Sequence, residues 1–295
     1  MVFRLAHLSD PHIGPLPRPT LRELMGKRAT GYVNWRRGRW RIHDMDMLDA
    51  LVADMRAHQP DHVAMTGDIL NIGLPAEFPL ARAWLESLGG ARDVSFAPGN
   101  HDAYVRASLP HLARFEPFFA GDDGAPGFPY LRVRGPVAIV GLNSAIPRPM
   151  FVSSGRVGAA QLARAESLLA QTGARGLARV VLLHHPPLAR EQRPGRSLID
   201  AAAFEAMIAR VGAELILHGH DHRQATRHIQ GPRGGVPVVG VASASVAPTA
   251  GHRPAAWHLF EFHAEGGGVR IAGRARGAVA DGAGIVDLGA LPLTP

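Results

Sequence analysis

Short apolar runs alternate with amphipathic stretches along most of the chain. The runs have the length of buried strands, and five of them span residues 3–9, 62–66, 94–97, 179–183 and 213–217. Between them, apolar residues spaced three or four apart indicate helices, which we expect at residues 43–58, 76–88, 159–171 and 200–211. This alternation is typical of parallel strands joined by helices.

A different pattern follows in the last part of the chain. Strand signals at residues 236–241, 256–262 and 269–272 follow one another without helices, and two more lie at 130–133 and 137–142. Parallel strands followed by an antiparallel run predict an α/β fold, in which two packed mixed β-sheets are flanked by helices.

The length of 295 residues fits one large α/β domain over residues 1–295. A basic insertion at about 15–42 interrupts its start, and we expect a short capped helix there, from Thr20 to near Gly31. An Ala/Gly-rich tail begins at about residue 273 and carries no clear pattern.

Polar residues gather where the predicted strands end. Five junctions share this feature: Asp10-Pro11-His12, Gly67-Asp68, Gly99-Asn100-His101-Asp102, His184-His185-Pro186 and Gly219-His220-Asp221-His222. In open α/β sheets the carboxyl ends of the strands form the edge where ligands bind. We therefore expect the five junctions to converge at one edge.

The junctions offer nitrogen and oxygen donors for metal ions. The candidate ligands are Asp10, His12, Asp68, Asn100, His184, His220 and His222. Seven donors exceed the needs of one tetrahedral ion and suit two divalent metal ions that share a carboxylate. Asp68 is the candidate bridge because it lies between the two groups of donors in the sequence. The chain has no cysteine, and these donor types suit Mn, Fe, Co or Zn.

The five motifs, in this order, resemble the calcineurin-like metallophosphoesterase superfamily over nearly three quarters of the chain. The resemblance implies a four-layer α/β/β/α sandwich. It also implies Asp10, His12 and His222 on one metal, Asn100, His184 and His220 on the other, and Asp68 between them. Among its members, the sequence is most similar to the small bacterial phosphodiesterases, because Asn71 and Ile72 replace the aspartate and arginine of the protein phosphatases.

The same resemblance implies a mechanism. A hydroxide bridging the metals attacks phosphorus in line, and His101 stabilises charge on the phosphoryl group or protonates the leaving oxygen. Asp102 is a second candidate catalytic residue because it could orient His101, although its place in a loop is equally compatible with a surface charge. The predicted activity is hydrolysis of a phosphodiester of the cyclic nucleotide or glycerophosphodiester type.

The basic segment, residues 15–42, carries a charge of +7, which equals the formal charge of the whole chain. It leaves the strand end that supplies Asp10 and His12, so we expect it at the rim of the site, outside the chemistry. Arginine interleaved with tryptophan and a short amphipathic helix is compatible with a membrane surface. An alternative function is therefore a membrane-surface pyrophosphatase or phosphodiesterase acting on a lipid-linked substrate such as UDP-diacylglucosamine.

Two other interpretations of the function fit fewer observations. A nuclease or nucleic-acid binder could use the aromatic residues of the basic segment for stacking, but that segment is short. A scaffold without activity would have no reason to keep seven donors. For the basic segment, the alternative to a membrane contact is a folded insertion that covers one edge of the sheet and binds no ligand. No apolar run reaches about 18 residues and the amino terminus lacks signal-peptide features. We therefore expect a cytoplasmic protein, or one peripheral to the inner face of the membrane.

Overall fold

Two six-stranded β-sheets form the centre of the computed structural model, which describes residues 2–125, 127–248, 252–266, 268–279 and 284–294. The first sheet has the order β12-β11-β10-β1-β2-β3 and the second β4-β5-β6-β7-β9-β8. The strands of the first sheet are β1 (Val2–Leu8), β2 (His62–Met65), β3 (Val94–Phe96), β10 (Ala256–Glu265), β11 (Gly268–Ala278) and β12 (Ile285–Ala290). Those of the second are β4 (Tyr130–Arg134), β5 (Val137–Gly141), β6 (Ala178–Leu182), β7 (Leu215–His218), β8 (Ala225–Gly231) and β9 (Gly234–Gly240).

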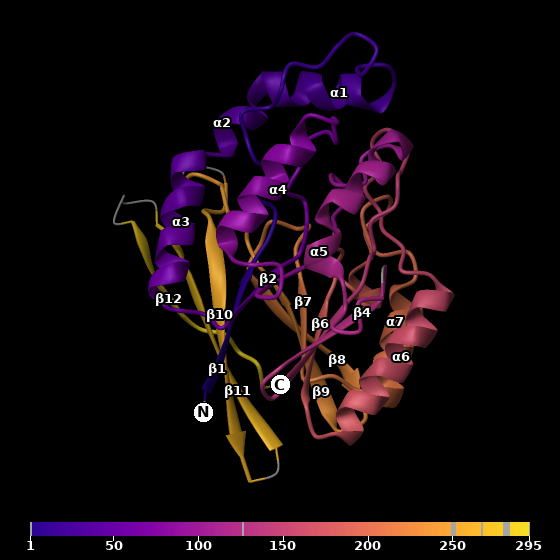
Figure 1. The fold of residues 1–295 in the computed structure, drawn as a ribbon, viewed down its shortest axis with the longest axis vertical. Coiled ribbons are helices and arrows are strands. Elements are labelled where there is room, and N and C mark those ends of the chain that lie inside the picture. The colour runs from indigo at the N-terminus through magenta and orange to yellow at the C-terminus, as the bar shows by residue number, and fades with distance from the viewer. Residues whose placement is uncertain (1, 126, 249–251, 267, 280–283, 295) are drawn as a thin grey trace.

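Helices cover the outer face of each sheet (Figure 1). The first sheet is covered by α3 (Met45–Ala57), α4 (Glu77–Leu88), the 3-10 helix η2 (Arg106–Phe115) and α5 (Glu116–Phe119). The second is covered by α6 (Ala159–Ala174) and α7 (Ala201–Val211). A third apolar cluster, which includes Leu5, Val180 and Phe260, lies between the sheets. The predicted fold of two packed mixed sheets flanked by helices is confirmed.

The strand directions follow from the connections. β1, β2 and β3 are parallel and joined by helices, as are β5, β6 and β7, with β9 parallel to β7. By contrast β10, β11 and β12 form an antiparallel run beside β1. The carboxyl ends of β1, β2, β3, β6 and β7 consequently point toward one common edge.

The helix expected in the basic segment has the wrong bounds, and the tail, for which no pattern was found, is structured. The capping box forms, because the Glu23 N–H donates to Thr20 Oγ1 and the Thr20 N–H donates to Glu23 Oε2. The residues that follow it, 21–26, form turns and not a helix. The helix α1 begins later, at Lys27, and runs past Gly31 to Asn34. The tail from residue 273, of which 280–283 lie outside the described residues, supplies most of β11 and all of β12. Strand pairing decides this region, and its Ala/Gly-rich composition gives no signal for it.

The basic segment lies above the carboxyl edge of both sheets, at the top of Figure 1. It continues from α1 through a π-helical turn, η1 (Trp35–Arg39), into α2 (Trp40–Ile42), and a short 3-10 helix, η3 (Ala189–Glu191), lies in the loop after β6. Within the described ranges, none of the helices is both long enough and apolar enough to cross a lipid bilayer.

Candidate metal centre

All seven predicted donors meet at the common strand edge, in two groups. In the first group, His222 Nε2 lies 3.2 Å from Asp10 Oδ1 and 3.3 Å from His12 Nε2. In the second, Asn100 Oδ1 lies 3.2 Å from His184 Nε2 and 2.9 Å from His220 Nδ1. The Asp68 carboxylate connects them: Oδ2 lies 3.3 Å from His184 Nε2, and a carboxylate oxygen lies within 4.8 Å of ligand atoms of Asp10 and of His12.

Backbone geometry directs these side chains inward. Five donors have left-handed backbone conformations that residues other than glycine seldom adopt, with φ from 42° to 69°; they are Asp10, His12, Asp68, His220 and His222. Such conformations cost free energy and gather at functional sites. Each one turns the chain sharply as it leaves a strand, so two donors of one loop can face the same space.

Close backbone contacts hold the loops together. The Asp10 N–H donates to Gly67 O at 2.9 Å, and the His12 N–H donates to Asp68 O at 3.2 Å. A side chain at position 219 would overlap Ser9 and the Asp10 carboxylate, which explains the glycine there. The loops after β1, β2 and β7 are therefore fixed relative to one another.

The ligand histidines are oriented by main-chain carbonyl groups. Nδ1 of His12 faces Leu70 O at 2.9 Å, and Nδ1 of His184 faces Thr66 O at 2.7 Å. In His220 the other nitrogen is used, since Nε2 lies 2.8 Å from Arg196 O. A carbonyl accepts, so each of these nitrogens carries a proton, and the other ring nitrogen points toward the donor cluster. This is the usual environment of a metal-bound histidine.

The carboxylates also fit a cationic ligand. Asp10 Oδ1 is fully buried and, among the described residues, receives no hydrogen bond. Although burial opposes ionisation, the neighbouring His222 lowers the pKa of Asp10, and His184 does the same for Asp68. Burial would lower the pKa of His184, but Asp68 raises it to about 9. Buried carboxylates that stay ionised need a cation nearby, so the donor set fits divalent metal ions.

His101 lies beside the predicted donors, with a ring nitrogen within 4.8 Å of ligand atoms of His12 and Asp68. Its ring is 4.7 Å from the His12 ring between centroids, and its Nδ1 donates to Asn71 O. Its backbone N–H donates to Asp68 Oδ1 at 2.7 Å. Burial, and next the Arg39 cation, lower the pKa of His101 to about 3. Its Nε2 faces the cleft, 3.3 Å from Arg39 Nη1.

Asp102 is not a surface charge, and its carboxylate is not the hydrogen-bond partner of the His101 ring. Asp102 is fully buried, and its carboxylate accepts four backbone N–H groups at 2.7–3.1 Å, from Gly99 and from Asp68, Ile69 and Leu70. The His101 ring is held by Asn71 O instead. Burial and the nearby Asp68 charge raise the pKa of Asp102 to about 7. Asp102 therefore positions the loop that carries Asp68.

His185 is a structural neighbour, as its place in the His-His-Pro motif suggests. Its ring is fully buried, with Nδ1 2.8 Å from Ser144 Oγ and Nε2 2.9 Å from Ser153 O. Both ring nitrogens are thus in use. The ring packs against His220 at 4.5 Å between centroids and limits where that ligand can turn.

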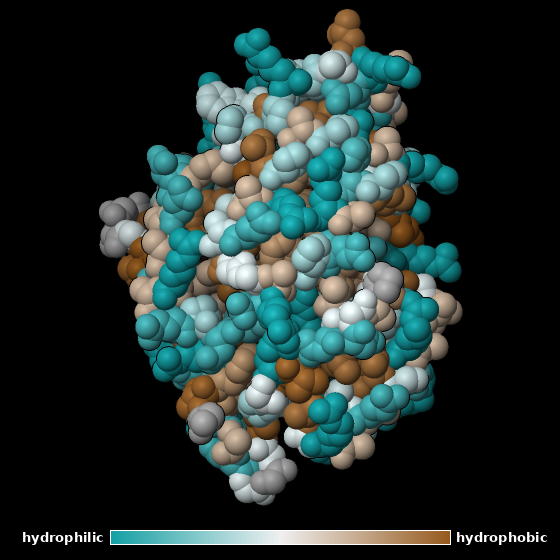
Figure 2. All heavy atoms as spheres, viewed as in Figure 1, coloured by the Kyte–Doolittle hydropathy of each residue, from teal (hydrophilic) through white to brown (hydrophobic). Residues whose placement is uncertain are grey.

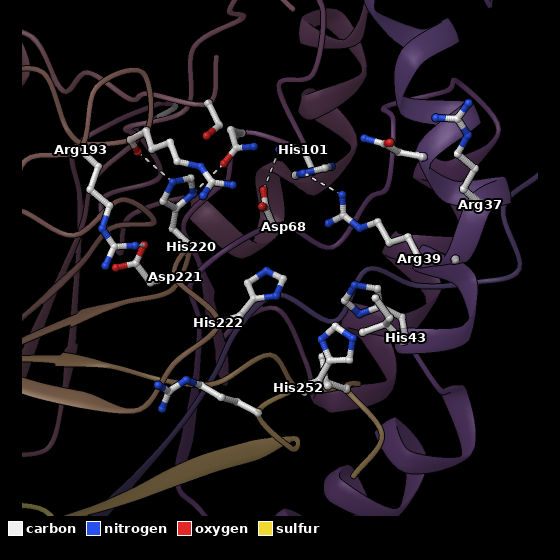
Figure 3. A pocket seen from close by; sticks show the side chains of 18 residues that line it. Arg37, Arg39, His43, Asp68, His101, Arg193, His220, Asp221, His222 and His252 are labelled. Atoms are coloured by element: carbon white, nitrogen blue, oxygen red, sulfur yellow. Dashed lines mark hydrogen bonds and ion pairs between the residues drawn. The ribbon is translucent and has the colours of Figure 1, made fainter. Parts of the chain in front are cut away.

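Sequence reasoning missed the cationic lining of the site. A cleft of about 750 Å³ opens over the donors, and Figure 3 shows the side chains around it. Five arginines line it: Arg37, Arg39, Arg193, Arg196 and Arg253. Arg39 does not stay at the rim as the rest of the basic segment was expected to, because its guanidinium contacts His12 and His101. The density of charge in that segment was the available signal, but the sequence does not say which arginine turns inward.

Buried carboxylates and imidazoles gathered at the strand ends of a two-sheet sandwich define a metal-dependent hydrolase. The chain belongs to the calcineurin-like phosphoesterase family, whose pattern matches residues 3–224, and it is a phosphoester hydrolase. A protein of Synechococcus sp. described as a probable cyclic nucleotide phosphodiesterase is 28% identical over 220 residues, which are 74% of this chain and 78% of that protein.

Solved structures of other proteins share the fold. A dimetal phosphatase from Danio rerio superposes with a TM-score of 0.63 at 15% identity, covering 97% of this chain and 98% of its own. A 5'-nucleotidase precursor from Thermus thermophilus gives a TM-score of 0.52 at 18% identity, covering 93% of this chain and 54% of its own. At these identities the comparison establishes the architecture.

The contacts of Asp102 lead to a first prediction. In Asp102→Asn an amide NH₂ replaces one carboxylate oxygen and faces backbone N–H donors, so the free energy of unfolding should fall by about 1–3 kcal/mol. Metal affinity should fall with it, because the loop of Asp68 loosens. Urea unfolding and metal titration check both effects, with Asp49→Asn on the exposed side of α3 as the control. Normal stability and metal binding with a lost kcat would return Asp102 to a catalytic role.

Proposed function

We propose that the protein is a phosphodiesterase with a binuclear metal centre, acting on a small diester of the cyclic nucleotide or glycerophosphodiester type. The observation that carries this proposal is the division of seven donors into two groups connected by Asp68. Asp10, His12 and His222 would hold one divalent ion, Asn100, His184 and His220 the other, and Asp68 would contact both.

When bound, such metals supply Lewis acidity and a water of lowered pKa for in-line attack on phosphorus. The chain's own residues prepare the site for this. The carbonyl groups of Thr66, Leu70 and Arg196 fix the tautomers of three histidines, and the buried wall of His185 prevents His220 from turning away. The donors are therefore preorganised, which lowers the cost of assembling the reactive geometry.

Two further observations support a diester. The relative from Synechococcus sp. is described as a probable cyclic nucleotide phosphodiesterase. In addition, the loop after Asp68 carries Asn71 and Ile72 where a protein phosphatase motif has an aspartate and an arginine, and the backbone of Asn71 and Ile72 is tied to the buried Glu77 carboxylate. The hydrogen bonds to Glu77 stabilise this loop, and neither of its two side chains is a cation that could bind a phosphomonoester.

A substrate screen with a metal-site variant tests the function. We expect the manganese-loaded protein to hydrolyse cyclic nucleotides or glycerophosphodiesters faster than phosphomonoesters or nucleoside diphosphates. Asp68→Asn should abolish turnover and lower the bound metal below two ions per chain, measured by elemental analysis, because the shared charge is lost. Asp49→Asn is the matched control. Full activity of Asp68→Asn with two bound ions would refute the binuclear centre.

His101 should contribute to turnover without holding metal. Its Nε2 faces the cleft, where it can contact the phosphoryl group or the leaving oxygen. His101→Ala should lower kcat by roughly 10²–10⁴ while elemental analysis finds the same metal content. A smaller loss with nitrophenyl leaving groups would indicate proton donation, and an equal loss would indicate charge stabilisation. A drop in metal content would instead show that His101 is a ligand.

A lipid-linked substrate at a membrane surface is the second candidate, and the exposure of the basic segment favours it. Leu21, Met25 and Trp40 are 89%, 73% and 48% exposed, and Arg22 and Arg41 beside them are exposed as well. Figure 2 shows an apolar side chain protruding at the top of the molecule between hydrophilic ones. Exposed apolar and cationic side chains together match an anionic lipid surface.

Co-sedimentation with vesicles tests this second candidate. The protein should sediment with phosphatidylglycerol vesicles at low salt and stay in solution with phosphatidylcholine. Replacing Leu21 and Met25 with serine should reduce binding at least tenfold and leave hydrolysis of a small diester unchanged. The control replaces Leu80 and Leu288, which are also exposed but lie outside the segment. A parent protein that ignores anionic vesicles would exclude the membrane role.

A further inference from the structure

The Arg39 guanidinium lies inside the cleft, directly over the donor cluster (Figure 3). Its Nη2 is 2.9 Å from His12 Nε2, and its Nη1 is 3.3 Å from His101 Nε2. It therefore lies between a predicted metal ligand and the histidine predicted to act on the phosphoryl group. Its contact with His12 Nε2 would be released when that nitrogen binds a metal ion, which leaves these N–H groups to a ligand over the donors.

Arg39 differs from the other inward-facing arginines in what it contacts. Arg28 donates to the carbonyls of Ile72 and Gly73, and Arg179 pairs with Glu214. Among the described residues, by contrast, no carboxylate lies within 4.0 Å of the Arg39 guanidinium, whose partners are two imidazoles. A guanidinium has five N–H donors, so most of its hydrogen-bonding capacity remains available to a ligand.

The basic segment is anchored on both sides of the cleft. On one side Tyr32 and Trp35 pack against a cluster formed by Leu16, Ile72, Leu74 and Tyr104. On the other side the Asp44 N–H donates to Ser245 O at 2.8 Å, and the Ala247 N–H donates to Ile42 O at 3.1 Å. Arg39 follows Gly38, whose non-helical backbone kinks the helical segment between these anchors. It is thus held in place by the fold.

The surroundings of Arg39 select for negative charge. Four more arginines line the cleft, and the acidic residues in its lining are Asp68 and Asp221. Asp221 lies 3.9 Å from Arg193, and Asp68 faces the donor cluster. The face of the cleft above the donors is therefore cationic. A guanidinium recognises phosphate through two parallel N–H···O bonds, and a fixed one loses little entropy in doing so.

We infer that Arg39 is a substrate-binding residue, which donates to non-bridging oxygens of the phosphate that undergoes hydrolysis. The inference rests on the proposed function, because that function places a phosphate over the donors. Arg39 and His101 then face the same phosphoryl group from the cleft side, next to His12. In this inference the basic segment contributes Arg39 to substrate binding, and its exposed residues are available for other contacts.

Phosphate binding provides a test that is independent of turnover. The metal-loaded protein is titrated with inorganic phosphate by calorimetry, and kcat/KM is measured on bis(p-nitrophenyl) phosphate. Arg39→Gln should weaken phosphate binding at least tenfold and lower kcat/KM by roughly 10²–10³, the usual effect of losing one hydrogen-bond donor to the transition-state oxyanion. Arg39→Lys should recover part of the binding, because lysine keeps the positive charge but lacks the two parallel N–H donors of the guanidinium. Arg36→Gln and Arg41→Gln, exposed in the same segment and outside the cleft lining, are the controls and should match the parent.

A second variant moves Arg39 without removing it. A methyl group at Gly31 would overlap the Tyr104 hydroxyl and Ile72, so Gly31→Ala should shift the segment and also weaken phosphate binding. Unchanged phosphate affinity in Arg39→Gln would overturn the inference, and so would a loss of bound metal, which would assign Arg39 to the metal site. If phosphate binding depends on Arg39 but no diester is hydrolysed, the inference stands and the proposed function fails.

Discussion

The contact between Asp68 and His184 joins the two halves of the molecule at the point where chemistry is expected. Asp68 follows β2 of the first sheet, and His184 follows β6 of the second. Neither sheet alone brings together enough donors for two ions. The apolar cluster between the sheets fixes their distance and angle, so core packing around residues such as Phe260 sets the separation of the two donor groups. Stability of the sandwich and geometry of the site are therefore coupled.

Asp102 shows how a buried charge can serve geometry. Four backbone N–H groups from two loops converge on one carboxylate, which replaces the regular pairing that those loops lack. The left-handed conformations of the donors need this kind of support, because an unsupported loop would relax to an ordinary conformation. The same logic applies to Glu77, which gathers three N–H groups from the loop after Asp68. Two carboxylates outside the reaction thus hold the loop that carries Asp68.

The sequence predicts those parts of the molecule that depend on local pattern. The strand ends with Asp10, Asp68 and His184 were predictable because apolar periodicity marks the strands and parallel topology brings their ends together. β12 was not predictable, because its Ala/Gly-rich sequence forms a strand only through pairing with β11. The role of Asp102 depends on which N–H groups lie free in other loops. The inward position of Arg39 depends on two anchors of its segment, at Ile72 and Ser245, which are more than 30 and more than 200 residues away in sequence.

The position of β1 has a consequence for the order of folding. β1 pairs with β2, about 50 residues later, but its other neighbour is β10, where His7 lies opposite His258. Asp10 likewise meets His220 across 210 residues. Closing such long loops is slow, and non-local strand pairing comes late. During synthesis the first half of the chain therefore emerges with one edge of β1 unpaired. Neither group of predicted donors is complete until the loop after β7, which carries His220 and His222, has left the ribosome.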